Sequence, residues 1–142
     1  MKTMTASIIA AIGLFSASAS AQTSATETTL PVYKATVDAG AFDDKESAMK
    51  KRGVTANPAD VRLIVPGVDK DSIYNLIGPP HFGETVTRRW NYVLFFFTGN
   101  GTERQRCRVE FRFARPEGKR VVEISEVVWQ EQSCADRVAA AN

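Results

Sequence analysis

The side chains that could carry out chemistry in this sequence are few and stand far apart. The only histidine is His81, in a proline-containing turn, and the only cysteines are Cys107 and Cys134. This set lacks the ligand spacing of a zinc site, and the sequence contains no Gly-x-Ser-x-Gly nucleophile motif and no glycine-rich phosphate loop. The carboxylates form no evident acid–base pair. We therefore predict a protein that is not an enzyme and holds no metal or cofactor.

The two cysteines are expected to form a structural disulfide bond. An even number of cysteines is usual for an exported chain, and Cys107 and Cys134 belong to neighbouring strands or their ends, so antiparallel pairing could bring them together. This bond would stabilise the fold by roughly 3 kcal/mol, chiefly by restricting the unfolded chain. The alternative, a redox-active pair, usually has Cys-x-x-Cys spacing near the start of a helix.

The N-terminus has the pattern of a cleaved signal peptide. Lys2 precedes a short apolar run, and Ala19-Ser20-Ala21 is a small-x-small cleavage site. The apolar run is shorter than the roughly 20 residues that a membrane-spanning helix needs. No cysteine lies near the cleavage site, so we expect no lipobox. The sequence predicts a mature chain that starts near Gln22 and is periplasmic or associated with the outer membrane.

Four regions are predicted along the chain. They are a signal peptide, a flexible or partly helical leader, a folded domain and a C-terminal tail, at residues 1–21, 22–56, 57–134 and 135–142. Within the leader, residues 30–37 would add an edge strand, although Pro31 weakens this prediction. Residues 44–51 favour a short exposed helix.

The charge of the chain is nearly balanced, with 18 Lys and Arg against 16 Asp and Glu. This balance argues against nucleic acid as a partner, since nucleic-acid binding needs a clustered basic face. The chain has one modest basic cluster, interrupted by Glu110, at Arg104, Arg106, Arg108 and Arg112. It is interpreted as a solvated strand face, with an anion or lipid-headgroup site as the alternative.

Two short helices are predicted within residues 57–78. Asn57 can cap the first helix, and Pro58 suits its first position because the missing N–H would be unpaired there. Asp69 can cap the second helix, whose apolar residues lie three and four apart and predict one buried stripe. Gly78 suits the left-handed conformation past the end of this helix.

Three antiparallel strands should follow the helices. The first, residues 88–97, is apolar on both faces. The second alternates, with Cys107, Val109, Phe111 and Phe113 expected to point inward and Arg106, Arg108, Glu110 and Arg112 outward. The third strand covers residues 120–130, where the doublet Val127-Val128 indicates either a bulge or a second buried face.

The predicted fold is therefore α+β, with two short helices packed on a three-stranded antiparallel meander in two layers. Two short helices cannot cover both faces of the apolar first strand, so either the leader or a partner must cover the second face. Six side chains on these strands are candidates for binding a partner, although alternating aromatic residues are more often part of a core. They are Trp90, Tyr92, Phe95, Phe97, Arg108 and Arg112.

The order of these elements resembles that of a known family. The shared features are two helices separated by Pro66-Gly67, the run Leu76-Ile77-Gly78-Pro79-Pro80, and the Trp90-x-Tyr92 pattern that opens the first strand. In this combination the chain resembles the SmpA/OmlA (BamE-like) outer-membrane assembly family. The turn Gly78-Pro79-Pro80-His81-Phe82 and Cys107 are also similar to those of BamE-like domains that precede OmpA-type domains.

The resemblance implies a non-catalytic periplasmic envelope protein with a scaffold or accessory role. Its implied partners are envelope proteins, including components of the barrel-assembly machinery, and anionic lipid headgroups. It also implies either a monomer or a domain-swapped dimer. The alternative is a secreted or periplasmic enzyme inhibitor, since β-lactamase inhibitor proteins have a similar helix–helix–sheet unit in tandem copies.

Overall fold

The structure is a computed structural model, and it describes residues 32–42, 53–82, 88–99 and 101–142 of the chain. The predicted signal peptide (1–21) and the predicted short helix (44–51) lie outside the described residues. Both therefore stay predictions.

A five-stranded sheet, with the strand order β1-β5-β4-β3-β2, forms the centre of the fold. The strands are β1 (Thr36–Val37), β2 (Val54–Thr55), β3 (Arg89–Thr98), β4 (Glu103–Ala114) and β5 (Glu123–Trp129). The three long strands form the predicted antiparallel meander, while β1 pairs in parallel with β5 and β2 with β3. The predicted α+β class is confirmed. The prediction of a three-stranded sheet was wrong, because segments of the leader add a short strand at each edge.

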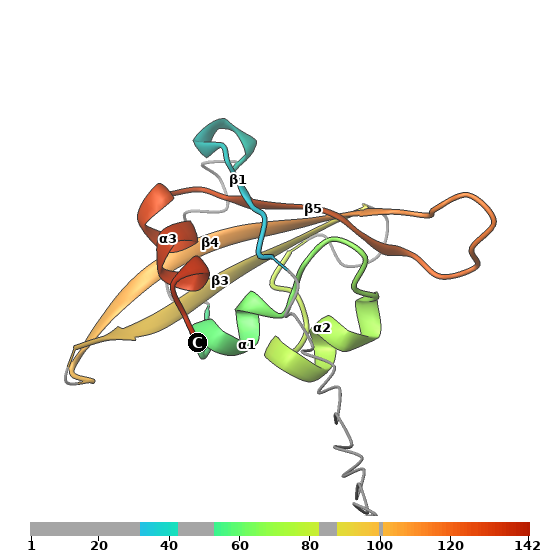
Figure 1. Cartoon of the computed structure of the whole chain (residues 1–142). Helices are drawn as coiled ribbons and strands as arrows, with labels where there is room; N and C mark the ends of the chain where they lie inside the picture. The colour runs from blue at the N-terminus through green and yellow to red at the C-terminus, as the bar shows by residue number, and fades with distance from the viewer. Residues whose placement is uncertain (1–31, 43–52, 83–87, 100) are drawn as a thin grey trace, which may run out of the picture.

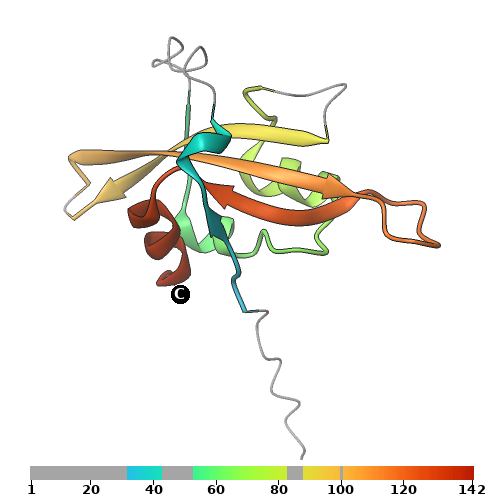
Figure 2. The same ribbon diagram turned by 90° about the horizontal axis from the view of Figure 1, so that it is seen from above.

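Three α-helices contribute buried side chains to one core on the same face of the sheet. They are α1 (Pro58–Arg62), α2 (Lys70–Ile77) and α3 (Gln132–Ala139). Figure 1 shows α1 and α2 below the sheet and α3 at the end where β3 and β4 meet. The one-turn 3-10 helix η1 (Ala39–Ala41) lies on the opposite side of the sheet, as both views show (Figures 1 and 2).

Helix α3 replaces much of the C-terminal tail that the sequence analysis expected from residue 135 onward. It buries Cys134, Ala135 and Val138, and no side chain caps its first turn. The helix is therefore held by tertiary contacts rather than by a local start signal. This is why residues 135–139 did not look helical in the sequence.

Both of the first two helices begin, and α2 also ends, where the sequence predicts, whereas α1 ends at Arg62, earlier than the predicted stop before Pro66. The side chain of Asn57 accepts a hydrogen bond from the amide of Ala59 at 3.1 Å, and that of Asp69 accepts one from Ser72 at 2.9 Å. Gly78 ends α2 with φ +79°, a conformation that favours glycine. The predicted caps are thereby confirmed.

The core lies between this helical layer and the sheet. The face of β3 predicted from the alternation is confirmed, since its residues are buried together against the helices: Trp90, Tyr92, Leu94 and Phe96. From β5, Val127 joins this core, whereas Val128 is buried beside Glu110 on the second face. The predicted doublet Val127-Val128 thus marks a second buried face. The register of β4 and β5 also shifts, between Arg112 and Phe113.

The second face of the sheet is largely covered by the chain itself. Val93 and Val128 are fully buried there, and Arg108 and Glu110, predicted to point into solvent, are only 4% and 2% exposed. The ring of Phe42, from the leader, lies under the Arg108 guanidinium at 4.9 Å. The prediction of a solvated face was wrong for Arg108 and Glu110, because side chains from the leader pack on this face.

The leader also fits closely beside β3. A Cβ atom at Gly53 would collide with the ring of Phe95 and crowd the side chain of Val93, so a larger residue here would displace the Phe95 ring. Immediately afterwards, β2 pairs with β3 through Val54 and Thr55. Of the two alternatives for the second face, the structure therefore favours the leader over a partner.

Candidate interaction surface

The described residues include no group of three or more His, Cys, Asp or Glu side chains that could hold a metal ion. The single histidine has a structural position. The Nδ1 atom of His81 accepts a hydrogen bond from the Val93 amide at 3.0 Å, and its ring packs edge-on against Tyr92 with centroids 5.7 Å apart. His81 thus satisfies a backbone donor at the outer edge of β3.

The six predicted partner-binding residues divide sharply by accessibility. Trp90, Tyr92 and Arg108 are buried within the chain, and the hydroxyl of Tyr92 donates a hydrogen bond to the carbonyl of Gly78 at 2.9 Å. Phe95 is half-buried, whereas Phe97 is 52% exposed. Of the aromatic side chains that the structure describes, Phe97 is the most exposed.

Arg112 belongs to an internal network of charges across the second face. Its Nε atom lies 2.7 Å from Glu110 Oε1, and its Nη1 atom lies 2.8 Å from Glu126 Oε2. Glu110 also accepts a hydrogen bond from Asn91 at 3.3 Å, and Glu126 accepts one from Thr36 of β1 at 3.0 Å. Arg112 is therefore neutralised by two carboxylates and is poorly suited to hold an external anion.

This network shifts the titration of its outer members. The hydrogen bond from Thr36 and then that from Arg112 lower the pKa of Glu126 from its ordinary value of 4.5. The hydrogen bond with Glu110 raises the pKa of Arg112 further. Because the folded pKa of Glu126 is lowered, its contribution to stability is complete above about pH 4.5 and is lost as the pH falls through the folded pKa.

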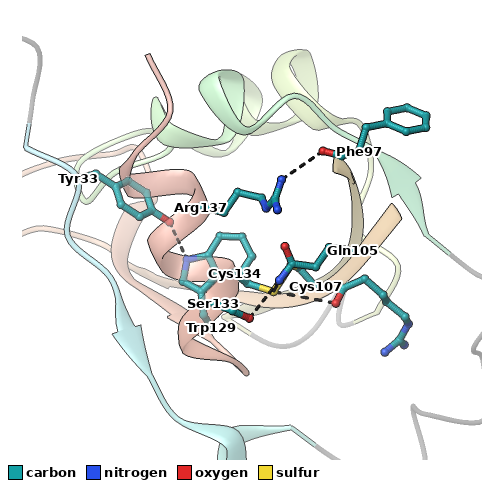
Figure 3. The surroundings of a disulfide bond; sticks show 9 residues. Tyr33, Phe97, Gln105, Cys107, Trp129, Ser133, Cys134 and Arg137 are labelled. Carbon is teal, nitrogen blue, oxygen red and sulfur yellow. Dashed lines mark hydrogen bonds between the residues drawn. A yellow bond between two sulfur atoms is a disulfide. The ribbon is translucent and has the colours of Figure 1, made fainter. Parts of the chain in front are cut away.

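The predicted disulfide bond joins Cys107 of β4 to Cys134 of α3. Both cysteines are buried, and Figure 3 shows the bond beside Trp129, between the helix and the sheet. The indole Nε1 of Trp129, a fully buried side chain, donates a hydrogen bond of 2.7 Å to the hydroxyl of Tyr33 in the leader. The hydrogen bond thereby ties the leader to β5, and the disulfide ties α3 to β4.

Replacing Tyr33 with phenylalanine should lower the free energy of unfolding by about 1–2 kcal/mol, because the buried Trp129 N–H loses its acceptor. Burial raises the pKa of Tyr33 to about 12. The wild-type protein should therefore lose stability as the pH rises from about 10, the unfolded value, toward 12. Urea denaturation of both proteins at pH 7 and pH 11 measures this. A difference between them that is the same at both pH values would contradict the assigned role of Tyr33.

The exposed Phe97 stands where β3, α1 and α3 come together. Arg137 of α3 donates a hydrogen bond to the carbonyl of Phe97 at 3.2 Å, while the ring of Phe97 points away from the helix (Figure 3). A hollow of about 330 Å³ next to this ring is lined by Thr55, Ala56, Asn57, Pro58 and Phe97. This end of the molecule thus combines an exposed aromatic ring with concave surface.

Sequence reasoning proposed Phe97 as a partner-binding residue and gave no signal for the residues that α3 places near it. Ser133 and Arg137 of α3 carry no motif, and their position depends on where α3 docks. The disulfide at Cys134, which was predicted, was the one signal that the C-terminal segment returns to the sheet.

No helix of the described residues is long and apolar enough to cross a membrane. Residues 53–121 match the family model described as Outer membrane protein assembly factor BamE domain. This span begins just before β2 and ends between β4 and β5, so β1, β5 and α3 lie outside it. No curated protein and no solved structure matches the chain.

Proposed function

We propose that this protein is a non-catalytic accessory component of outer-membrane assembly, because residues 53–121 match the family model of the BamE domain. The family match carries the proposal. It agrees with a chain whose histidine and cysteines all have structural positions. The expected location is the periplasm or the periplasmic side of the outer membrane.

The partner surface in this proposal is the end of the sheet around Phe97. An aromatic ring that is 52% exposed at the end of a strand, beside a hollow, is the kind of anchor on which protein interfaces concentrate their binding energy. We expect the partner to be an envelope protein, such as a component of the barrel-assembly machinery. The family match lends no support to the enzyme-inhibitor alternative.

Site-specific photo-cross-linking in the intact envelope tests this proposal. A photoreactive residue at position 97 should yield covalent adducts with envelope-assembly proteins. The matched control is position 121, since Val121 is exposed to a similar degree (53%) and belongs to the connection between β4 and β5. Figure 1 shows this connection at the opposite end of the sheet from the turn between β3 and β4. Equal adducts at both positions, or none at position 97, would count against the proposed surface.

The substitution Phe97→Asp should reduce recovery of the partner at least tenfold in a native pull-down, because it places a charge in an apolar contact. It should leave the unfolding midpoint nearly unchanged, because the ring is half exposed and lies outside the core. Val121→Asp serves as the control and should retain the partner. Loss of the partner in both variants would mean that added charge alone, rather than the Phe97 contact, weakens binding.

Two further properties stay open to measurement. We expect either a monomer or a domain-swapped dimer, which light scattering at several concentrations distinguishes. Contact with anionic lipid is measured by flotation with phosphatidylglycerol vesicles, with phosphatidylcholine vesicles as the control.

A further inference from the structure

A larger hollow, of about 570 Å³, lies between α1 and α3 on the helical side of the sheet. Its lining residues are Pro58, Gln105, Ser133, Arg137, Ala140 and Ala141. Pro58 also lines the hollow next to Phe97, so the two hollows adjoin. Together their lining residues extend from α3 to Phe97 at the end of β3.

The charge that the described lining residues bring to this hollow is positive. Arg137 is the charged member, and no carboxylate lies among them. Its guanidinium donates to the carbonyl of Phe97, an uncharged acceptor, and a guanidinium has five donors in all. The neighbouring carboxylate of Asp136 accepts a hydrogen bond from Gln132, at 2.7 Å, one turn back along α3.

Ser133 adds a second donor to the same side of α3. It precedes Arg137 by four residues, which places both side chains on one face of the helix. The Ser133 hydroxyl oxygen accepts a hydrogen bond from Gln105 Nε2 at 3.0 Å, so its own O–H is left to donate. A hydroxyl and a guanidinium one turn apart suit a carboxylate, which accepts at both oxygens.

The dipole of α3 opposes the binding of an anion at this position only weakly. The carboxyl end of a helix carries about half a negative charge, which acts within its last turn. The full positive charge of Arg137 exceeds it. The small side chains of Ala140 and Ala141 leave the hollow open beside the guanidinium.

We propose that the two adjoining hollows form a groove that binds an extended acidic segment of a partner protein. A Glu or Asp carboxylate of that segment pairs with Arg137 and Ser133, and an apolar side chain next to it packs against Pro58 and Phe97. The inference rests on the proposed function and names the partner chemistry of the same end of the molecule. Arg137 and Ser133 lie outside residues 53–121, so the site adds to the matched domain.

A peptide array with the purified protein tests the inference. It contains heptapeptides that carry one Glu among apolar residues, each paired with the same peptide carrying Gln instead. The wild-type protein should bind the best Glu peptides at least tenfold more tightly than their Gln partners. In Arg137→Gln this preference should disappear, because the charge that distinguishes the two peptides is gone.

Two further variants complete the test. Arg120→Gln removes the same charge from an exposed site beyond β4 and should keep the preference. Ala140→Trp fills the hollow without changing the charge, and should weaken binding of both peptides at least tenfold. The inference is overturned if no Glu peptide is preferred, if the preference survives in Arg137→Gln, or if Arg120→Gln also abolishes it.

The array and the envelope cross-linking fail in different ways. Cross-links at position 97 without a preference for Glu peptides would retain the proposed function and reject the acidic partner. A preference for Glu peptides without cross-links to assembly proteins would retain the groove and reject the assembly role.

Discussion

Replacing both Cys107 and Cys134 with alanine is expected to lower the free energy of unfolding by about 3 kcal/mol. The bond closes a loop that includes most of β4, all of β5 and the turn between them, and its loss enlarges the conformational freedom of the unfolded chain. For a small domain this is a large part of the total stability. Urea denaturation, with tryptophan fluorescence as the signal, measures the effect.

The loss should be concentrated in α3. This helix lacks a side-chain cap at its start and depends on the disulfide and on the burial of Ala135 and Val138. Hydrogen exchange should therefore accelerate in residues 132–139 of the double variant more than in α2, which has its own cap at Asp69. A double variant within 1 kcal/mol of the wild type, with α3 still protected, would show that packing alone holds the helix.

Replacing Arg112 with methionine should cost about 3 kcal/mol, which is at the low end of the range for breaking a buried ion pair. The side chain of Glu110 is only 3% exposed, and without Arg112 the hydrogen bond from Asn91 is its remaining described partner. The low end of the range applies because Arg112 itself is 28% exposed, so water partly screens the interaction. Chemical denaturation at pH 7 measures the loss.

The matched control is the double variant Glu110→Leu with Arg112→Met. It removes both charges, so no carboxylate is left buried without its partner, and its stability should return to within about 1 kcal/mol of the wild type. If the single and the double variant are equally destabilised, the cost comes from lost packing rather than from an unpaired charge.

The parts of the fold that could be predicted from the sequence are those that depend on local interactions. Asn57 and Asp69 cap helices by accepting hydrogen bonds from residues two and three positions away, so the helix starts could be predicted from local sequence. The apolar alternation of β3 identified its core face for the same reason. The disulfide was predictable because the sequence has only two cysteines, although the sequence reasoning placed Cys134 after a strand and the structure places it in α3.

The parts that were missed depend on distant contacts. A two-residue strand such as β1 or β2 has no periodicity of its own, and α3 gains stability only when docked on the core. The charges of Arg108 and Glu110 alternate with apolar residues as in a solvated strand. Their burial comes from leader residues such as Phe42, more than sixty positions away.

The candidate site divides in the same way. Phe97 was predicted because β3 is apolar on both faces, and both faces must be buried by the chain or by a partner. The groove beside Arg137 was not predicted, because a single arginine in a short helix forms a site only together with residues from other elements. Its neighbours Pro58 and Gln105 come from α1 and β4.

The contact of the leader with β5 has a consequence for the order of folding. Thr36 and Val37 pair with Val128 and Trp129, and the amide of Asp38 donates to the carbonyl of Trp129 at 2.9 Å. Partners some ninety positions apart must meet late, because closing so long a stretch of chain is entropically slow. Because the chain is synthesised from its amino end, β1 cannot pair until β5 has been made, so this edge of the sheet stays unformed until synthesis is nearly complete.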